Sequence, residues 1–169
     1  MLKQVSPWQR MLQQFLASRP VSALMARVLH RADGLLLRFS HGRLDFTRAA
    51  GLPVIELITT GARSGLRRTL PLAGMPDGAN YVLVASNFGG ARHPAWYHNL
   101  KANPDCEVRR HGVTGAYVAR EAEGTERERC WRLAVSYYLG YEAYRRRAGL
   151  RRIPVMVLEP RSTSPGPER

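Results

Sequence analysis

The first third of the chain has the hydrophobic periodicity of an amphipathic helix. Ser6 and Pro7 are typical of a helix start, because serine caps free backbone amides and proline fits the first helical position. Pro20 predicts a kink or a break. The pattern predicts an N-terminal amphipathic helical arm over residues 1–33. Its apolar positions are Met11, Leu12, Phe15, Leu16, Val21, Leu24, Met25, Val28 and Leu29.

From residue 52 onward the pattern changes to short β-branched segments separated by glycine and proline turns. Pro71 is typical of an edge strand or a bulge, and Thr125 with Glu128 is typical of a capping box that opens a helix. We expect strands at 54–60, 69–75, 81–86, 107–110, 113–121 and 153–158, and helices at 96–102, 125–138 and 141–147. These elements predict an α+β domain over residues 34–160, built around a small antiparallel barrel, with a disordered tail at 161–169.

The charge of the chain is strongly positive. Its 169 residues include 26 Lys+Arg and 13 Asp+Glu, a formal net charge of +13, and all the basic residues except Lys3 and Lys101 are arginine. An arginine fork binds phosphate or carboxylate at two points. The excess therefore indicates a polyanionic small molecule, an anionic membrane surface or nucleic acid, unless most of it is solvated surface that reflects codon bias.

Other compositional features exclude several classes of protein. Apolar residues make up 44% of the chain, which is enough for a core. No apolar run approaches the roughly 20 residues of a membrane helix, and Arg10, Arg19 and Arg27 interrupt the segment where a signal peptide would lie. Cys106 and Cys130 have no disulfide or zinc spacing. We expect a cytoplasmic protein without a transmembrane helix.

The glycine-bounded turn after the first strand is the best candidate anion site. Backbone amides in such a turn form an anion-binding nest, and nearby arginines and hydroxyls add charge-assisted hydrogen bonds. A polar hairpin turn often carries arginines without any ligand. The turn matches neither a P-loop nor a dinucleotide-binding fingerprint. Its candidate ligands are Arg63, Ser64, Arg67, Arg68 and Thr69.

The segment from Ala85 to Leu100 offers a surface for a flat ligand. Its glycines allow close approach to the backbone. Trp96 supplies an aromatic face, although a buried tryptophan is also typical of a core anchor. His93 and His98 lack a third ligand nearby, so no metal site is expected.

Three tyrosines, Tyr137, Tyr141 and Tyr144, follow the spacing i, i+4 and i+7. On a continuous helix they would share one face. A phenol there is able to hydrogen-bond a substrate oxygen or relay a proton. The alternative is an aromatic stripe packed on the barrel, whereas Gly140 between them favours a mobile lid.

Four blocks of the sequence resemble one known family. In order, ITTGARSGLRRTLPL, YVLVASNFGGARHPAWYHNLKANP, YLGYEAY and IPVMVLEP are similar to the deazaflavin-dependent nitroreductases, over roughly residues 50–160. HPAWYHNLKANP is the most specific of these motifs. The resemblance implies an FMN-binding-like split β-barrel that binds coenzyme F-420, which carries a phosphate and a glutamate tail. Many relatives read SKGG or SKAG where this chain has Ser86-Asn87-Phe88-Gly89-Gly90, so a lysine is replaced by Asn87 and Phe88 is an extra residue.

The resemblance also implies roles for particular residues. The cofactor phosphate would bind at the turn, the deazaflavin ring would lie along the second block, and tyrosines would line the substrate side. The residues concerned are Arg63, Ser64, Gly65, Arg67, Arg68 and Thr69 for the phosphate; Ala85, Ser86, Asn87, Gly89, Gly90, Trp96 and Asn99 for the ring; and Tyr137, Tyr141 and Tyr144 for catalysis.

The expected function is hydride transfer from reduced coenzyme F-420 to a planar acceptor, such as a quinone or a nitroaromatic compound. Two alternatives stay open: a split-barrel oxidoreductase that binds FMN, and a non-enzymatic basic domain that binds RNA or a membrane. No nucleic-acid-binding motif is present. A homodimer is compatible with the fold. The 1–33 arm would allow peripheral contact with the inner face of the membrane.

Overall fold

The computed structural model describes residues 51–161. The predicted arm at 1–33 lies outside the described residues, as does the predicted tail apart from Arg161. Within them, seven strands form one antiparallel sheet in the order β2-β1-β5-β6-β7-β4-β3. The strands are β1 (Val54–Thr60), β2 (Arg67–Ala73), β3 (Met75–Asp77), β4 (Asn80–Val84), β5 (Asp105–Arg110), β6 (Val113–Glu121) and β7 (Val155–Pro160).

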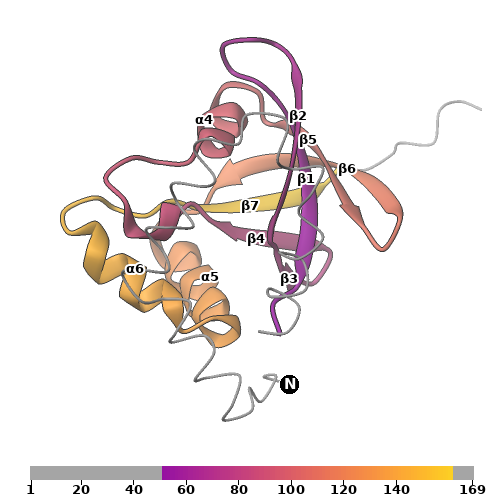
Figure 1. Ribbon diagram of the computed structural model, residues 1–169. Helices are drawn as coiled ribbons and strands as arrows, with labels where there is room; N and C mark the ends of the chain where they lie inside the picture. Colours follow the sequence, from indigo (N-terminus) through magenta and orange to yellow (C-terminus); the bar gives the residue numbers. More distant parts are fainter. Residues whose placement is uncertain (1–50, 162–169) are drawn as a thin grey trace, which may run out of the picture.

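Three α-helices accompany this curled sheet: α4 (Ala95–Ala102), α5 (Gly124–Tyr137) and α6 (Gly140–Ala148). In Figure 1, α5 and α6 lie together beside β4, while α4 lies near the projecting β1–β2 hairpin. The arrangement is a split β-barrel, which confirms the fold class expected from the sequence.

Both faces of the central strands are buried, because alternate side chains enter two different apolar clusters. In β7, Val155 and Val157 pack with the α5 and α6 side chains, whereas Met156 and Leu158 pack on the other face with Trp96 of α4. The sheet therefore holds α4 on one side and the α5–α6 pair on the other.

The sequence-predicted strand at 69–75 is in fact two strands. β2 and β3 are separated by Gly74, whose N–H donates to the carbonyl of Pro53 at 3.0 Å. A Cβ on Gly74 would lie 2.6 Å from Cδ1 of Ile55, so glycine lets the chain bend closely over β1. Pro71 does lie on an edge strand, as predicted.

The predicted capping box is wrong. Helix α5 begins at Gly124 with Glu123 as its N-cap, so Thr125 lies inside the first turn, and no side chain caps the helix. Its far end also differs from the prediction of a helix to residue 138, because α5 ends at Tyr137 and α6 begins at Gly140. Consequently Tyr137 belongs to one helix, and Tyr141 and Tyr144 belong to the next.

Candidate functional site

The turn between β1 and β2 is exposed and is closed by its own hydrogen bonds. Gly61 N–H donates to the carbonyl of Leu66 and Gly65 N–H donates to the carbonyl of Gly61, both at 2.8 Å. Ser64 Oγ accepts from Leu66 N–H at 3.3 Å. A Cβ on Gly61 would lie 2.6 Å from this Oγ, so only glycine lets the Ser64 hydroxyl fold over the turn. The result is a preformed loop that displays Arg63 to solvent.

Asn99 of α4 fixes the turn to the end of β1. Its Oδ1 accepts the N–H of Ala62 at 3.0 Å, and its Nδ2 donates to Thr59 Oγ1 at 3.2 Å. The side chain of Thr59 is buried, so the bond satisfies a polar group that water does not reach. Asn99 thus holds the candidate anion loop in place from a neighbouring helix.

Replacing Asn99 with leucine is expected to destabilise the protein by about 1–3 kcal/mol, because both of its hydrogen-bond partners lose their bond to it. Asn99→Asp is the matched control. It keeps two oxygen acceptors, for the Ala62 N–H and for the Thr59 hydroxyl, so the cost should stay below about 1 kcal/mol. Urea denaturation of the two variants measures the difference. Equal stability would show that Asn99 does not fix the turn.

The two neighbouring arginines that begin β2 lie on opposite faces of the sheet. In the β1–β2 register Thr59 lies opposite Arg68, and successive residues alternate faces. Arg67 and Thr69 therefore share the other face, where Arg67 forms an ion pair with Glu107 at 2.8 Å. Arg68 shares the face of Thr59. Among residues 51–161, neither Arg68 nor Arg63 has a carboxylate partner.

The segment from Ala85 to Gly90 leaves β4 and makes one tight turn with positive φ angles at Asn87 (45°), Phe88 (56°) and Gly89 (78°). Gly89 packs directly on α6, where an added Cβ would lie 2.7 Å from the carbonyl oxygen of Tyr144. Glycine at this position serves packing, which the sequence analysis did not foresee. Ala85 and Ser86 are buried beneath the turn.

Two arginines outside the expected site hold this segment. Arg151 donates to the carbonyls of Ser86 at 2.6 Å, Gly90 at 2.7 Å and Ala85 at 3.4 Å. Arg147 donates to the carbonyl of Phe88 at 2.9 Å. Sequence reasoning missed both, because they lie in a run of arginines between residues 145 and 152 in which nothing separates inward-facing from solvated side chains.

His93 continues this network toward α4. Arg151 donates to His93 Nδ1 at 3.0 Å, so the neutral ring carries its proton on Nε2. Burial, with the charges of Arg151 and His98, lowers the pKa of His93 and favours this neutral form. Within the described part of the chain, no group of three or more His, Cys, Asp or Glu residues has the geometry of a metal site.

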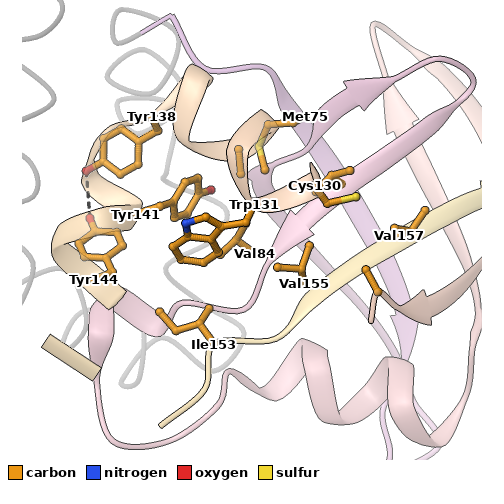
Figure 2. Packing of buried hydrophobic residues seen from close by; sticks show 13 residues of the cluster. Met75, Val84, Cys130, Trp131, Tyr138, Tyr141, Tyr144, Ile153, Val155 and Val157 are labelled. Carbon is orange, nitrogen blue, oxygen red and sulfur yellow. Dashed lines mark hydrogen bonds between the residues drawn. The ribbon is translucent and has the colours of Figure 1, made fainter. Parts of the chain in front are cut away.

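The tyrosines form a buried cluster at the α5–α6 junction (Figure 2). Tyr138 and Tyr144 share a hydrogen bond of 3.0 Å between their hydroxyls, and the Tyr138 and Tyr141 rings meet edge to face with centroids 5.3 Å apart. Burial raises the pKa of all three phenols, so they stay protonated near neutral pH. Tyr138 occupies the place expected for Tyr137, which is only half-buried. This follows from the break between the helices.

Trp96 also lies mainly in the core. Its side chain is 9% exposed and belongs to the apolar cluster that lies between the sheet and α4. The structure therefore brings the turn, α4 and the segment 85–90 into one connected region, with Trp96 and Asn99 as its support. The tyrosine cluster lies on the other side of the segment 85–90, where the Phe88 ring meets Tyr144 edge-on with centroids 5.8 Å apart.

Comparison with known proteins identifies the family of the chain. Residues 32–160 match the family model described as F420H(2)-dependent quinone reductase. The chain is 37% identical over 138 residues to an F420H(2)-dependent quinone reductase of Mycobacterium tuberculosis, covering 77% of this chain and 89% of the relative. The chain belongs to this family. Members of this family are oxidoreductases, and the family is named for reduced coenzyme F-420 and quinone. The match confirms the resemblance inferred from the four sequence blocks.

Solved structures agree with the family assignment. A structure described as an F420-H2 dependent reductase has a TM-score of 0.59 and 42% sequence identity, covering 63% of this chain and 94% of that chain. A second structure, described as a domain-swapped dimer, has the same TM-score and identity and covers 80% of that chain. Among the described residues, no helix is long and apolar enough to cross a membrane.

The residues present fit the cofactor named in the family. The turn offers two arginines that no carboxylate within 51–161 neutralises, and the Ser64 hydroxyl, which accepts from Leu66 N–H, keeps its own hydrogen to donate. Such donors suit a phosphate or a glutamate carboxylate. Cys106 and Cys130 are both buried, and burial raises the pKa of both thiols.

Proposed function

We propose that the protein reduces a quinone with reduced coenzyme F-420 as the electron donor, binding the donor between the β1–β2 turn and the segment 85–90. The observation that carries the proposal is that both segments fall within the 32–160 match to the quinone reductase family. When bound, the cofactor supplies the hydride. The protein binds it, orients it and excludes water.

The turn is proposed to bind the anionic part of the cofactor. Arg63 and Arg68 donate to phosphate oxygens, and Ser64 adds a hydroxyl donor close to the turn backbone. Gly65 supplies the positive φ of 65° at which its N–H closes the turn on the carbonyl of Gly61. Arg67 and Thr69 lie on the opposite face of the sheet, so they bind a different part of the cofactor. Otherwise Arg67 contributes only its positive charge, which attracts the anionic cofactor at long range.

The segment after β4 is proposed to lie along the deazaflavin ring. Asn87 and Gly90 are half-buried there, and Asn87 Nδ2 donates to the carbonyl of Arg92 at 2.9 Å, which ties the loop across its base. Ala85, Ser86 and Gly89 support this surface from beneath. Trp96 and Asn99 act from α4, one by packing and the other by holding the turn.

Among the tyrosines, Tyr141 is the strongest candidate for contact with the acceptor. Tyr138 and Tyr144 use their hydroxyls on each other, whereas the Tyr141 hydroxyl makes no hydrogen bond within residues 51–161. A protonated phenol is able to donate to a quinone oxygen as charge develops on it. Tyr137 is the last residue of α5, has an interaction of its own and packs, partly buried, against the same cluster.

Tyr141→Phe is therefore expected to lower kcat for a menadione-like quinone by about 10- to 100-fold, since one donor to the developing charge is lost. The Kd for the cofactor should stay within about twofold. Stopped-flow oxidation of the reduced deazaflavin measures the first quantity and fluorescence titration measures the second. A variant that loses stability and leaves kcat unchanged would assign Tyr141 to the core alone.

The cofactor assignment is tested by titrating the protein with coenzyme F-420 and, separately, with FMN while following tryptophan fluorescence. Micromolar binding of F-420 with weaker binding of FMN is expected. The reverse order would replace the proposal with the FMN-binding alternative. Steady-state assays with quinones and with nitroaromatic compounds then determine which acceptor class is reduced faster.

The proposal also includes a homodimeric assembly and a cytoplasmic location. The domain-swapped dimer among its structural neighbours supports a homodimer, which analytical ultracentrifugation tests directly. A cytoplasmic location, with peripheral contact through the 1–33 arm, stays a prediction, and that arm lies outside the described residues. Flotation of the full chain with anionic vesicles tests the contact.

A further inference from the structure

Arg151 lies after α6 and before β7, outside every segment that the sequence patterns associate with the cofactor. Its guanidinium is half-buried and reaches back across the fold to the carbonyls of Ala85, Ser86 and Gly90 and to the ring of His93. All the bonded atoms lie in the loop between β4 and α4. The Arg151 side chain therefore hydrogen-bonds both ends of the segment 85–90.

These bonds determine which way the peptide groups of the segment face. In a trans peptide the N–H points opposite to the C=O of the preceding residue. Because Arg151 holds the carbonyls of Ser86 and Gly90, the N–H groups of Asn87 and Ala91 point away from it. No backbone hydrogen bond within residues 51–161 uses either of these two amides. Two backbone donors, both pointing away from Arg151, are thereby left for another molecule.

The loop conformation also needs support from outside. Asn87 and Phe88 have φ angles of 45° and 56°, and a left-handed conformation costs a residue with a side chain on the order of 1 kcal/mol. The backbone bonds inside the turn run from Gly89 N–H to Ser86 O and from Gly90 N–H to Asn87 O, both at 2.9 Å, and Asn87 Nδ2 donates to the carbonyl of Arg92 at its base. The bonds from Arg151 add a charged clamp that stabilises this geometry.

We propose that Arg151 is a positioning residue of the cofactor site, holding the segment 85–91 so that the Asn87 and Ala91 amides hydrogen-bond the polar edge of the deazaflavin ring. This rests on the proposed function, since it takes the F-420 ring as the ligand of the segment. A lysine at this position cannot do the same, because an ammonium lacks the planar fork that reaches several carbonyls at once.

The experiment compares Arg151→Lys and Arg151→Ala with Arg152→Lys and Arg152→Ala. Arg152 is the adjacent residue, is exposed and has no partner among the described residues. Each Arg152 variant therefore makes the same change in charge as the corresponding Arg151 variant without removing a hydrogen bond. Hydrogen–deuterium exchange of the cofactor-free protein reports on the amides of residues 86–91, circular dichroism reports on folding, and fluorescence titration gives the Kd for F-420.

Arg151→Lys is expected to raise exchange in residues 86–91 alone and to weaken F-420 binding by about 10-fold, and Arg151→Ala by about 100-fold, while the Arg152 variants stay within about twofold. Millimolar guanidinium chloride should restore binding to Arg151→Ala, and equal sodium chloride should not. If Arg151→Ala does not fold, the lysine variant still decides the question.

Two results would overturn the proposal. Faster exchange at 86–91 with unchanged F-420 affinity would show that the clamp shapes a loop that does not bind the ring. Unchanged exchange and unchanged affinity would show that the clamp is unnecessary. Failure of the unaltered protein to bind F-420 is a separate outcome, which overturns the proposed function itself, whatever the exchange pattern of the variants.

Discussion

Replacing Arg63 and Arg68 together with alanine is expected to weaken F-420 binding on the order of 1,000-fold. A hydrogen bond to a charged group contributes roughly 1.5–3 kcal/mol, and two of them are lost. The effect should be large because no carboxylate within residues 51–161 competes for either side chain. Folding should be little affected, since both arginines are exposed. Fluorescence titration at constant ionic strength measures the change in Kd.

The matched control for this double variant is Arg146→Ala with Arg152→Ala. It removes the same two charges from exposed positions near α6, so it corrects for the general attraction between a basic protein and an anion. We expect it to weaken binding by less than about fivefold. Arg67→Ala should also fall below about tenfold, because Arg67 lies on the other face and is paired with Glu107. Equal losses in all three variants would remove the turn from the phosphate site.

The sequence predicted strands well where alternation and turn residues agree. β1 and β6 have the predicted bounds, and the hairpin around His111 and Gly112 forms as expected. The ends of α5 could not be predicted in the same way. Thr125 and Glu128 have the spacing of a capping box, yet the helix already begins at Gly124, three residues after β6 ends at Glu121. Tertiary context decided that boundary.

The sequence named the candidate segments of the site, which stay a prediction, but not their internal geometry. The arginines of the turn looked equivalent in sequence, whereas the β1–β2 register assigns Arg67 to one face and Arg68 to the other. Arg151 gave no local signal at all, because its partners lie about sixty residues earlier in the chain. Long-range hydrogen bonds of this kind become visible only once the fold brings α6 against the loop.

The tyrosines show a related limit. The i, i+4 and i+7 spacing is correct for one helix, but the chain makes two. Gly140 begins α6, and a Cβ there would lie 2.2 Å from the Tyr138 ring. Tyr138 therefore turns inward beside Tyr144, and the buried set becomes Tyr138, Tyr141 and Tyr144. The structure therefore shows the packed stripe, with Tyr138 in place of Tyr137, while a catalytic role of the tyrosines stays a prediction.

Gly89→Ala is expected to destabilise the protein by about 2–5 kcal/mol. Its φ of 78° is unfavourable for alanine by roughly 1–2 kcal/mol. The new Cβ would also lie 2.7 Å from the carbonyl oxygen of Tyr144 and 2.8 Å from Cβ of Arg147, and overpacking of this kind costs about 1–3 kcal/mol more. Backbone atoms of α6 cannot yield as a flexible side chain would, so the helix must move away from the loop.

Gly112→Ala separates these two contributions. Gly112 has a similar φ of 81°, but an added Cβ there meets nothing within 4 Å, so only the backbone cost of about 1–2 kcal/mol applies. Urea denaturation of both variants gives the difference, which measures how tightly α6 packs on the segment 85–90. Equal destabilisation would mean that the contact is loose. A larger loss for Gly89→Ala, accompanied by weaker F-420 binding, would show that the packing of α6 supports the loop that we propose binds the ring.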